Sequence, residues 1–134
     1  MRLVIAACLL LMTPALAEPS YMIGTWFGTG QPHDRSSMYI DRMRPNGTWR
    51  GEYRTCIKGK AEDLVQEGNW QLTGDMLILK VKTVNDFPMP RTDSYRMLSH
   101  SPTAQKYVEL PLNFPYTPKR VADDFKMPPC DLVS

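Results

Sequence analysis

The fold is decided by Arg44–Thr55, the stretch RPNGTWRGEYRT. Its first residues fit a type I turn closed by a glycine bulge. Pro45 sets φ at the first corner, Asn46 suits the second corner, and Gly47 takes the left-handed position that follows. The stretch therefore predicts a β-hairpin with a three-residue loop, and the register of its strands can be followed residue by residue.

That register separates the hairpin into two faces. Arg44 pairs with Thr48, and the strands extend over 37–43 and 48–56. The inward pairs are Met43 with Trp49, Asp41 with Gly51 and Tyr39 with Tyr53, and the outward pairs are Arg42 with Arg50, Ile40 with Glu52 and Met38 with Arg54. An aromatic face opposite a charged face is what a half-buried antiparallel pair requires. Asp41 is the exception, and a two-residue Asn-Gly turn would shift the pairing by one and turn Asp41 outward, so both placements remain open.

Further strands follow from the same alternation. Residues 63–72 and 76–84 flank a Gly74-Asp75 turn, residues 94–100 and 105–110 form a third hairpin, and residues 21–28 make a first strand. In the second hairpin a two-residue turn pairs Leu72 with Leu77, Trp70 with Leu79 and Gly68 with Val81 on the inner face, and leaves Lys80 and Lys82 outside. About seven short strands joined by hairpins predict an all-β fold, a small antiparallel up-and-down β-barrel.

The segments between and after these strands carry the turn-forming residues. Residues 30–36 and 85–93 are predicted as loops, the second because it contains two prolines. The barrel domain is expected over 18–110. The tail, 111–134, is proline-rich, and a short helix over Lys119–Lys126 is predicted because proline suits a first helical turn. The tail should pack on the outside of the barrel.

The N-terminus has the features of a secretory signal peptide over residues 1–17. Arg2 supplies the positive start, residues 3–12 are apolar, and Ala15–Ala17 is a small-x-small cleavage site. Lipidation at Cys8 is the alternative interpretation. No later run approaches the roughly 20 apolar residues of a membrane span. The mature protein is therefore expected to be exported, either periplasmic or secreted, without a transmembrane segment.

Removal of the leader leaves two cysteines, Cys56 and Cys130. In an exported chain such a pair predicts one disulfide bond, with a free pair or a metal site as the alternative. Loss of Arg2 leaves 16 − 1 = 15 basic residues against 14 acidic ones, and the two signs are interspersed. Nucleic acid is therefore not expected as a partner.

The chain resembles a known group of barrels at the start of its first strand. Gly24–Trp26 is similar to the Gly-x-Trp signature of the lipocalin and calycin families. Together with Gly51–Tyr53 it is also similar in part to avidin-like barrels, but Phe27–Gly30 lacks the asparagine expected of a biotin site. The lipocalin resemblance implies an interior ligand cavity, a disulfide from the C-terminal segment to the middle of the barrel, and a short helix outside it. The basic residue that packs on the signature tryptophan in that family has no clear counterpart in the sequence.

Five inward side chains are the candidate ligand-binding residues: Tyr39, Asp41, Trp49, Tyr53 and Trp70. A carboxylate beside two phenols could orient a polar ligand, or it could be hydrogen-bonded for structural reasons or lie at the wet mouth of the barrel. Repeated tryptophans at strand positions could equally be core. No nucleophile elbow, paired metal-ligand motif or phosphate loop is present, so no catalytic residue, cofactor or metal site is predicted.

These features favour an exported, non-catalytic protein that binds a small apolar or amphipathic ligand. The alternative is a protein-interaction or inhibitor module of the cell envelope, with a filled barrel and an envelope protein as its partner. In that case loops 28–36 and 85–93 would carry function, and Phe87–Pro90 would offer an apolar patch. The two hypotheses differ in whether function depends on Trp49 and Tyr53 or on the loops.

Overall fold

The computed structural model describes residues 20–130, which form one antiparallel sheet of nine strands. The strands are β1 (Gly24–Gln31), β2 (Asp34–Met43), β3 (Thr48–Ile57), β4 (Lys60–Thr73), β5 (Met76–Val84), β6 (Phe87–His100), β7 (Gln105–Glu109), β8 (Phe114–Tyr116) and β9 (Lys119–Val121). Strands β1 to β8 follow one another in space as they do in the chain, so the connections are up-and-down. The fold is the all-β architecture that the sequence predicts.

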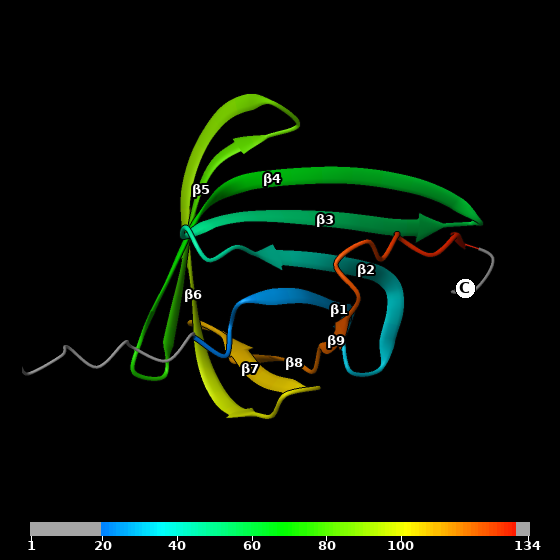
Figure 1. The fold of residues 1–134 in the computed structure, drawn as a ribbon. Coiled ribbons are helices and arrows are strands. Elements are labelled where there is room, and N and C mark those ends of the chain that lie inside the picture. The colour runs from blue at the N-terminus through cyan, green and yellow to red at the C-terminus, as the bar shows by residue number, and fades with distance from the viewer. Residues whose placement is uncertain (1–19, 131–134) are drawn as a thin grey trace, which may run out of the picture.

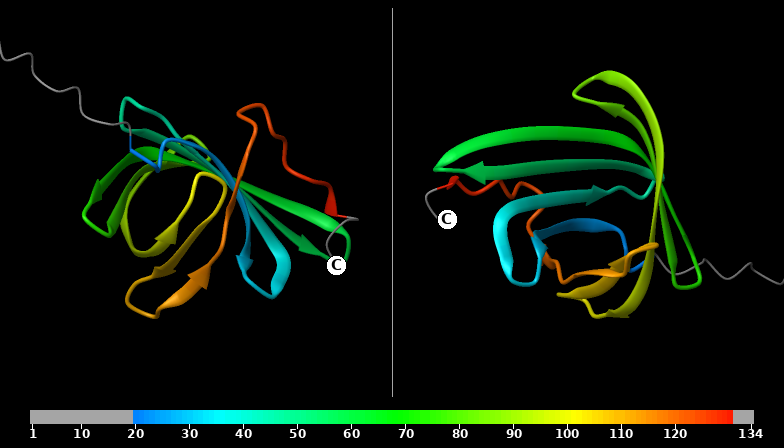
Figure 2. Two further views of the ribbon diagram at one scale, coloured as in Figure 1. Left: turned by 60° about the horizontal axis from the view of Figure 1, so that its bottom comes forward. Right: turned by 180° about the vertical axis from the view of Figure 1, so that it is seen from behind.

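The sheet curls into a half-barrel, as Figures 1 and 2 show. Strand β8 lies at one end of the sheet beside β7, whereas β9 lies at the other end beside β1. The two are consecutive in the chain, so residues 114–121 join the two ends of the sheet. A bridge between Ala104 and Lys119, and a bond of 3.0 Å from the Gln105 amide to the Pro118 carbonyl, add to this connection.

The β2–β3 hairpin has the predicted turn and register. The Arg44 amide donates to the Thr48 carbonyl at 3.0 Å, and Gly47 adopts a φ of 81°. Asp41 pairs with Gly51 and therefore points to the inner face. The prediction of a three-residue loop is confirmed, and the alternative two-residue turn is wrong for this hairpin.

The β4–β5 hairpin is also confirmed. Trp70 pairs with Leu79 and Gly68 with Val81, while Lys80 is exposed on the outer face. Strand β4 starts at Lys60, earlier than predicted, because Lys58-Gly59 alone makes the turn after β3 with both residues at positive φ.

The predicted loop over 85–93 is wrong. Asn85 and Asp86, both at positive φ, make a tight turn, and β6 begins directly at Phe87. Prolines are tolerated here because β7 pairs with β6 only from Tyr95 onward, which leaves the proline-bearing part of β6 at a free edge of the sheet. The predicted loop over 30–36 is likewise shortened, since β1 ends at Gln31 and β2 begins three residues later.

The predicted helix over 119–126 is also wrong. Residues 119–121 form β9, because their backbone groups pair with β1, and the sheet therefore extends beyond the predicted boundary at 110. Residues 122–130 do lie on the outer face, as expected. There Phe27 packs against Phe125 at 5.0 Å between ring centroids, and Arg42 donates to the Phe125 carbonyl at 2.7 Å.

A disulfide joins Cys56 at the end of β3 to Cys130, which confirms the predicted pair. Both sulfurs lie in a small outer cluster with Met38 and Met127. The bond is compatible with an exported protein. The predicted signal peptide lies outside the described residues. Within 20–130, no helix has the length and apolar character needed to cross a membrane.

The main core fills one end of the half-barrel. Trp26 and Trp49 are its largest members, and both are 1% exposed. Arg120 of β9 covers the Trp26 ring from outside, with its guanidinium carbon 4.3 Å from the ring centroid. The same guanidinium donates to the carbonyls of Pro102 and Ile23 at 2.7 and 2.9 Å. Arg120 thus connects β9 to the segment that precedes β1.

Candidate functional site

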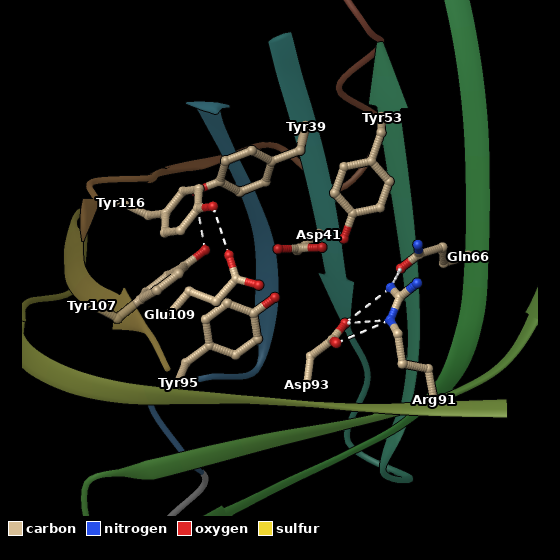
Figure 3. Close-up of a pocket in the computed structure, with 10 residues that line it drawn as sticks. All are labelled: Tyr39, Asp41, Tyr53, Gln66, Arg91, Asp93, Tyr95, Tyr107, Glu109 and Tyr116. Carbon is tan, nitrogen blue, oxygen red and sulfur yellow. Dashed lines mark hydrogen bonds and ion pairs between the residues drawn. The ribbon is translucent and has the colours of Figure 1, made fainter. Parts of the chain in front are cut away.

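The inner face of the sheet encloses a cavity of about 400 Å³ beside the core (Figure 3). Its lining comes from β2, β3, β4, β6, β7 and β8: Tyr39, Asp41, Tyr53, Gln66, Arg91, Asp93, Tyr95, Tyr107, Glu109 and Tyr116. Every one of these side chains carries a polar group. The volume falls within the range of small-molecule sites.

Tyrosines make up five of the ten wall residues, and the sequence has six tyrosines in all. The hydroxyls of Tyr39 and Tyr107 are hydrogen-bonded to each other at 3.0 Å. Tyr95 meets Tyr107 edge-on at 5.4 Å between ring centroids, and Tyr116 meets Tyr39 in the same way at 6.0 Å. These contacts fix the rings against one another, so the wall is preformed.

Asp41 projects from the middle of β2 into the cavity and is only 7% exposed. One of its oxygens, Oδ1, accepts a hydrogen bond of 2.9 Å from Trp49 Nε1. Burial raises the pKa of this carboxyl to about 6, and the bond from Trp49 opposes that rise. Asp41 is therefore a carboxyl that changes charge near neutral pH.

Arg91 and Asp93 make an ion pair on β6. The guanidinium donates to both oxygens of Asp93, with Nε–Oδ1 at 3.0 Å and Nη2–Oδ2 at 3.0 Å. The same Nη2 donates to Gln66 Oε1 on β4 at 3.2 Å. The single cation of the cavity wall is thus held by a carboxylate and an amide that are themselves part of that wall.

Glu109 lies across the cavity from Asp41, on β7 (Figure 3). One of its oxygens, Oε2, accepts a hydrogen bond of 2.9 Å from the Tyr116 hydroxyl. Burial, followed by this bond and the charge of Glu109, raises the pKa of Tyr116. Tyr116 therefore remains a neutral donor at physiological pH.

Several polar atoms of the wall have no hydrogen-bond partner among residues 20–130. Two of them are the donors Gln66 Nε2 and Arg91 Nη1, and four are oxygens: the hydroxyls of Tyr53 and Tyr95, Asp41 Oδ2 and Glu109 Oε1. All fully buried side-chain polar atoms in that part of the chain are satisfied, so these four reach the open cavity. Burial raises the pKa of both Tyr53 and Tyr95, which keeps the two phenols protonated. The cavity therefore presents neutral hydroxyls and carboxylate oxygens to its interior, together with the N–H groups of Gln66 and Arg91.

The structure brings three of the five sequence-predicted residues to the cavity wall: Tyr39, Asp41 and Tyr53. Trp49 lies behind the wall in the core and contacts the site through its bond to Asp41. Trp70 lies away from the cavity, and its Nε1 donates to the Arg44 carbonyl at the β2–β3 turn.

Sequence reasoning missed the wall residues on β4, β6, β7 and β8. The sequence did contain a signal, because residues two apart in a strand share one face. Arg91, Asp93 and Tyr95 have this spacing, as do Tyr107 and Glu109. The prolines nearby argued for a loop and hid the β6 residues. Tyr116 could not be found because β8 contains Pro115, lies between Pro111 and Pro118, and pairs with β7 over three residues only.

The two histidines do not take part in the cavity. His100 stacks on Tyr21 with ring centroids 3.6 Å apart, and His33 lies in the β1–β2 turn. Among residues 20–130, no group of three His, Cys, Asp or Glu side chains is arranged to hold a metal ion.

Comparison of the chain with protein-family models and with curated proteins found no match. The antiparallel half-barrel is compatible with a calycin-like fold.

Proposed function

We propose that this protein binds a small molecule in its inner cavity and does no chemistry on it. The observation that carries the proposal is the set of cavity-facing polar atoms without partners, above all the hydroxyls of Tyr53 and Tyr95. These atoms are accessible in the cavity, whereas a space that served only packing would be lined by apolar side chains. Unpaired groups around a preformed space are typical of a ligand site.

The proposed ligand is polar, which modifies the apolar or amphipathic ligand that the sequence favours. All ten wall residues carry a polar group. An apolar molecule in this cavity would remove water from carboxylates and hydroxyls without replacing their hydrogen bonds. Apolar contact would come only from the tyrosine rings.

We also propose that the fold is lipocalin-like in its details. Trp26 of the Gly-x-Trp triplet is covered by Arg120 of β9, and this supports the likeness because a basic residue packs on the signature tryptophan in that family. Export is part of the same proposal, and the Cys56–Cys130 bond supports it.

Mass spectrometry of protein purified from its own cells tests this function. We expect the native mass to exceed the denatured mass by a discrete small molecule. The double variant Tyr53→Phe, Tyr95→Phe removes two hydroxyls while keeping both rings, and it should lose that molecule and stay folded. An unliganded native mass for wild-type protein, with no binding from a library of polar metabolites, would contradict the proposal.

A second candidate function, the protein-interaction module, has one observation in its favour. Phe87 and Met89 are 72% and 51% exposed, and they lie where β6 has no partner strand on its β7 side. The double variant Phe87→Ser, Met89→Ser leaves the cavity wall intact. Loss of a co-purifying protein with this variant, and not with the tyrosine variant, would favour the interaction module.

A further inference from the structure

We infer that the ligand of the cavity is a small organic cation, an amine or substituted ammonium attached to a compact body. The inference rests on the proposed binding function and specifies its ligand class. Charge, hydrogen-bonding capacity and aromatic surface each point to the same class.

The cavity wall carries more negative charge than positive charge. Three carboxylates line the cavity, Asp41, Asp93 and Glu109, against the single guanidinium of Arg91. That guanidinium is engaged by both oxygens of Asp93. The ion pair therefore neutralises one carboxylate, and it leaves the other two without a cationic partner in the cavity.

The two carboxylates without a cationic partner point into the cavity. Asp41 and Glu109 project toward one another from opposite walls, with tyrosine rings around them (Figure 3). Each gives one oxygen to a neighbour, Asp41 to Trp49 and Glu109 to Tyr116. The second oxygen of each faces the cavity. A group that donates hydrogen bonds and carries positive charge would satisfy both.

Tyrosine rings give the cavity an aromatic surface. Rings of Tyr39, Tyr53, Tyr95 and Tyr116 lie around the two carboxylates, with neighbouring centroids 6.0 to 6.5 Å apart. A cation is attracted to the face of such rings, and the attraction is stronger away from bulk water. The neutral hydroxyls of Tyr53 and Tyr95 add oxygen acceptors at the same place.

The same features disfavour other ligand classes. An anion would meet the two carboxylates Asp41 and Glu109, and the one guanidinium of the wall is already ion-paired with Asp93. A neutral polar ligand could use the hydroxyls, but it would leave Asp41 and Glu109 uncompensated in a partly enclosed space. A bare metal ion needs several converging ligands, whereas within residues 20–130 no group of three His, Cys, Asp or Glu side chains is arranged to hold one.

Calorimetric titration with a matched set of probes tests the inference. The set is 2-phenylethylamine, 2-phenylethanol and 3-phenylpropionate, which share one body and differ in charge, at pH 7.5. We expect the amine to bind at least about tenfold more tightly than the alcohol, and the acid not to bind. Asp41→Asn and Glu109→Gln each keep a hydrogen-bond acceptor in place, and each should weaken the binding of the amine by about tenfold. Asp124→Asn, an exposed carboxylate outside the cavity, is the control and should bind as wild type does.

The outcomes separate this inference from the function on which it rests. If the alcohol or the acid binds as well as the amine, and Tyr53→Phe weakens that binding, the cavity is a ligand site but the cationic class is wrong. Binding of Ca²⁺ in preference to the amine, lost in Asp41→Asn, would overturn the inference in the same way. If wild-type protein binds no probe while its native mass carries a neutral or anionic metabolite, only the cationic class fails. A failure of both experiments would remove the binding function as well.

Discussion

At the scale of single residues, Asp41 decides the character of the site. It lies at an inward position of β2, between the inward pairs Tyr39–Tyr53 and Met43–Trp49 of β2 and β3, which are aromatic or apolar. The chain keeps a carboxyl at this place and holds it with one hydrogen bond from Trp49. Burial of a group with only one partner costs free energy, which is compensated when a ligand supplies charge or hydrogen bonds.

The raised pKa of Asp41 makes the stability of the fold depend on pH. The folded pKa is about 6 against an ordinary value of 3.8, so the folded state binds the proton more tightly than the unfolded state. Stability from this group is therefore complete below pH 4 and is lost as pH rises through 6, by up to about 3 kcal/mol. Denaturant unfolding at pH 4 and pH 7 should show this loss in wild-type protein.

Asp41→Asn is the matched variant, because it keeps an oxygen for Trp49 and does not titrate. Its change in unfolding free energy between pH 4 and pH 7 should lack that contribution. Other groups that face Asp41 across the cavity, Arg91, Asp93 and Glu109, are the same in both proteins. Parallel pH dependence in wild type and variant would contradict the assignment.

At the scale of elements, the residues of the turns allowed the strand pairing to be predicted. The register of the β2–β3 and β4–β5 hairpins follows from the residues of their turns, and Asp41 and Tyr53 fell on the inner face for that reason. Two elements could not be predicted. The edge position of β6, which tolerates Pro88, depends on where β7 ends. The strand β9 depends on pairing with β1, about 95 residues earlier in the chain, and no local signal reports such a contact.

Strand β9 is held to the rest of the sheet by Arg120. Arg120→Ala removes the contact with Trp26 and the bonds to the Pro102 and Ile23 carbonyls. We expect a loss of unfolding free energy of about 2 kcal/mol. Lys119→Ala, an exposed neighbour on the same strand, should change stability by less than about 0.5 kcal/mol. Equal effects of the two substitutions in denaturant unfolding would contradict this role.

At the scale of the whole molecule, the interior is divided between a core and a cavity. Trp26, Trp49 and the aliphatic residues of β5 fill one end, and the tyrosine-lined cavity occupies the rest of the inner face. Residues 122–130 cover the part of the outer face formed by β1, β2 and β3, and the disulfide ties them to β3. The core and the proposed binding cavity thus occupy neighbouring parts of the interior, and Tyr107 belongs to both.

The disulfide should stabilise the molecule without shaping the cavity. It closes a loop with a sequence separation of 74 residues, so Cys56→Ser with Cys130→Ser should lower the free energy of unfolding by up to about 4 kcal/mol. Hydrogen exchange should become faster in residues 122–130 and stay slow in the middle of β2. Loss of ligand binding in a variant that is still folded would contradict the separation of the two roles.

The central claim is that the inner cavity receives a small organic cation, and the three indole N–H groups test it most directly. Trp49 donates to Asp41 at the cavity, Trp26 donates to the Met22 carbonyl in the core, and Trp70 donates to the Arg44 carbonyl at an outer turn. In ¹H–¹⁵N NMR spectra, titration with 2-phenylethylamine should move the Trp49 indole signal to saturation and leave that of Trp70 in place. A shift of Trp70 with Trp49 unchanged, or no shift of any indole signal, would contradict the claim.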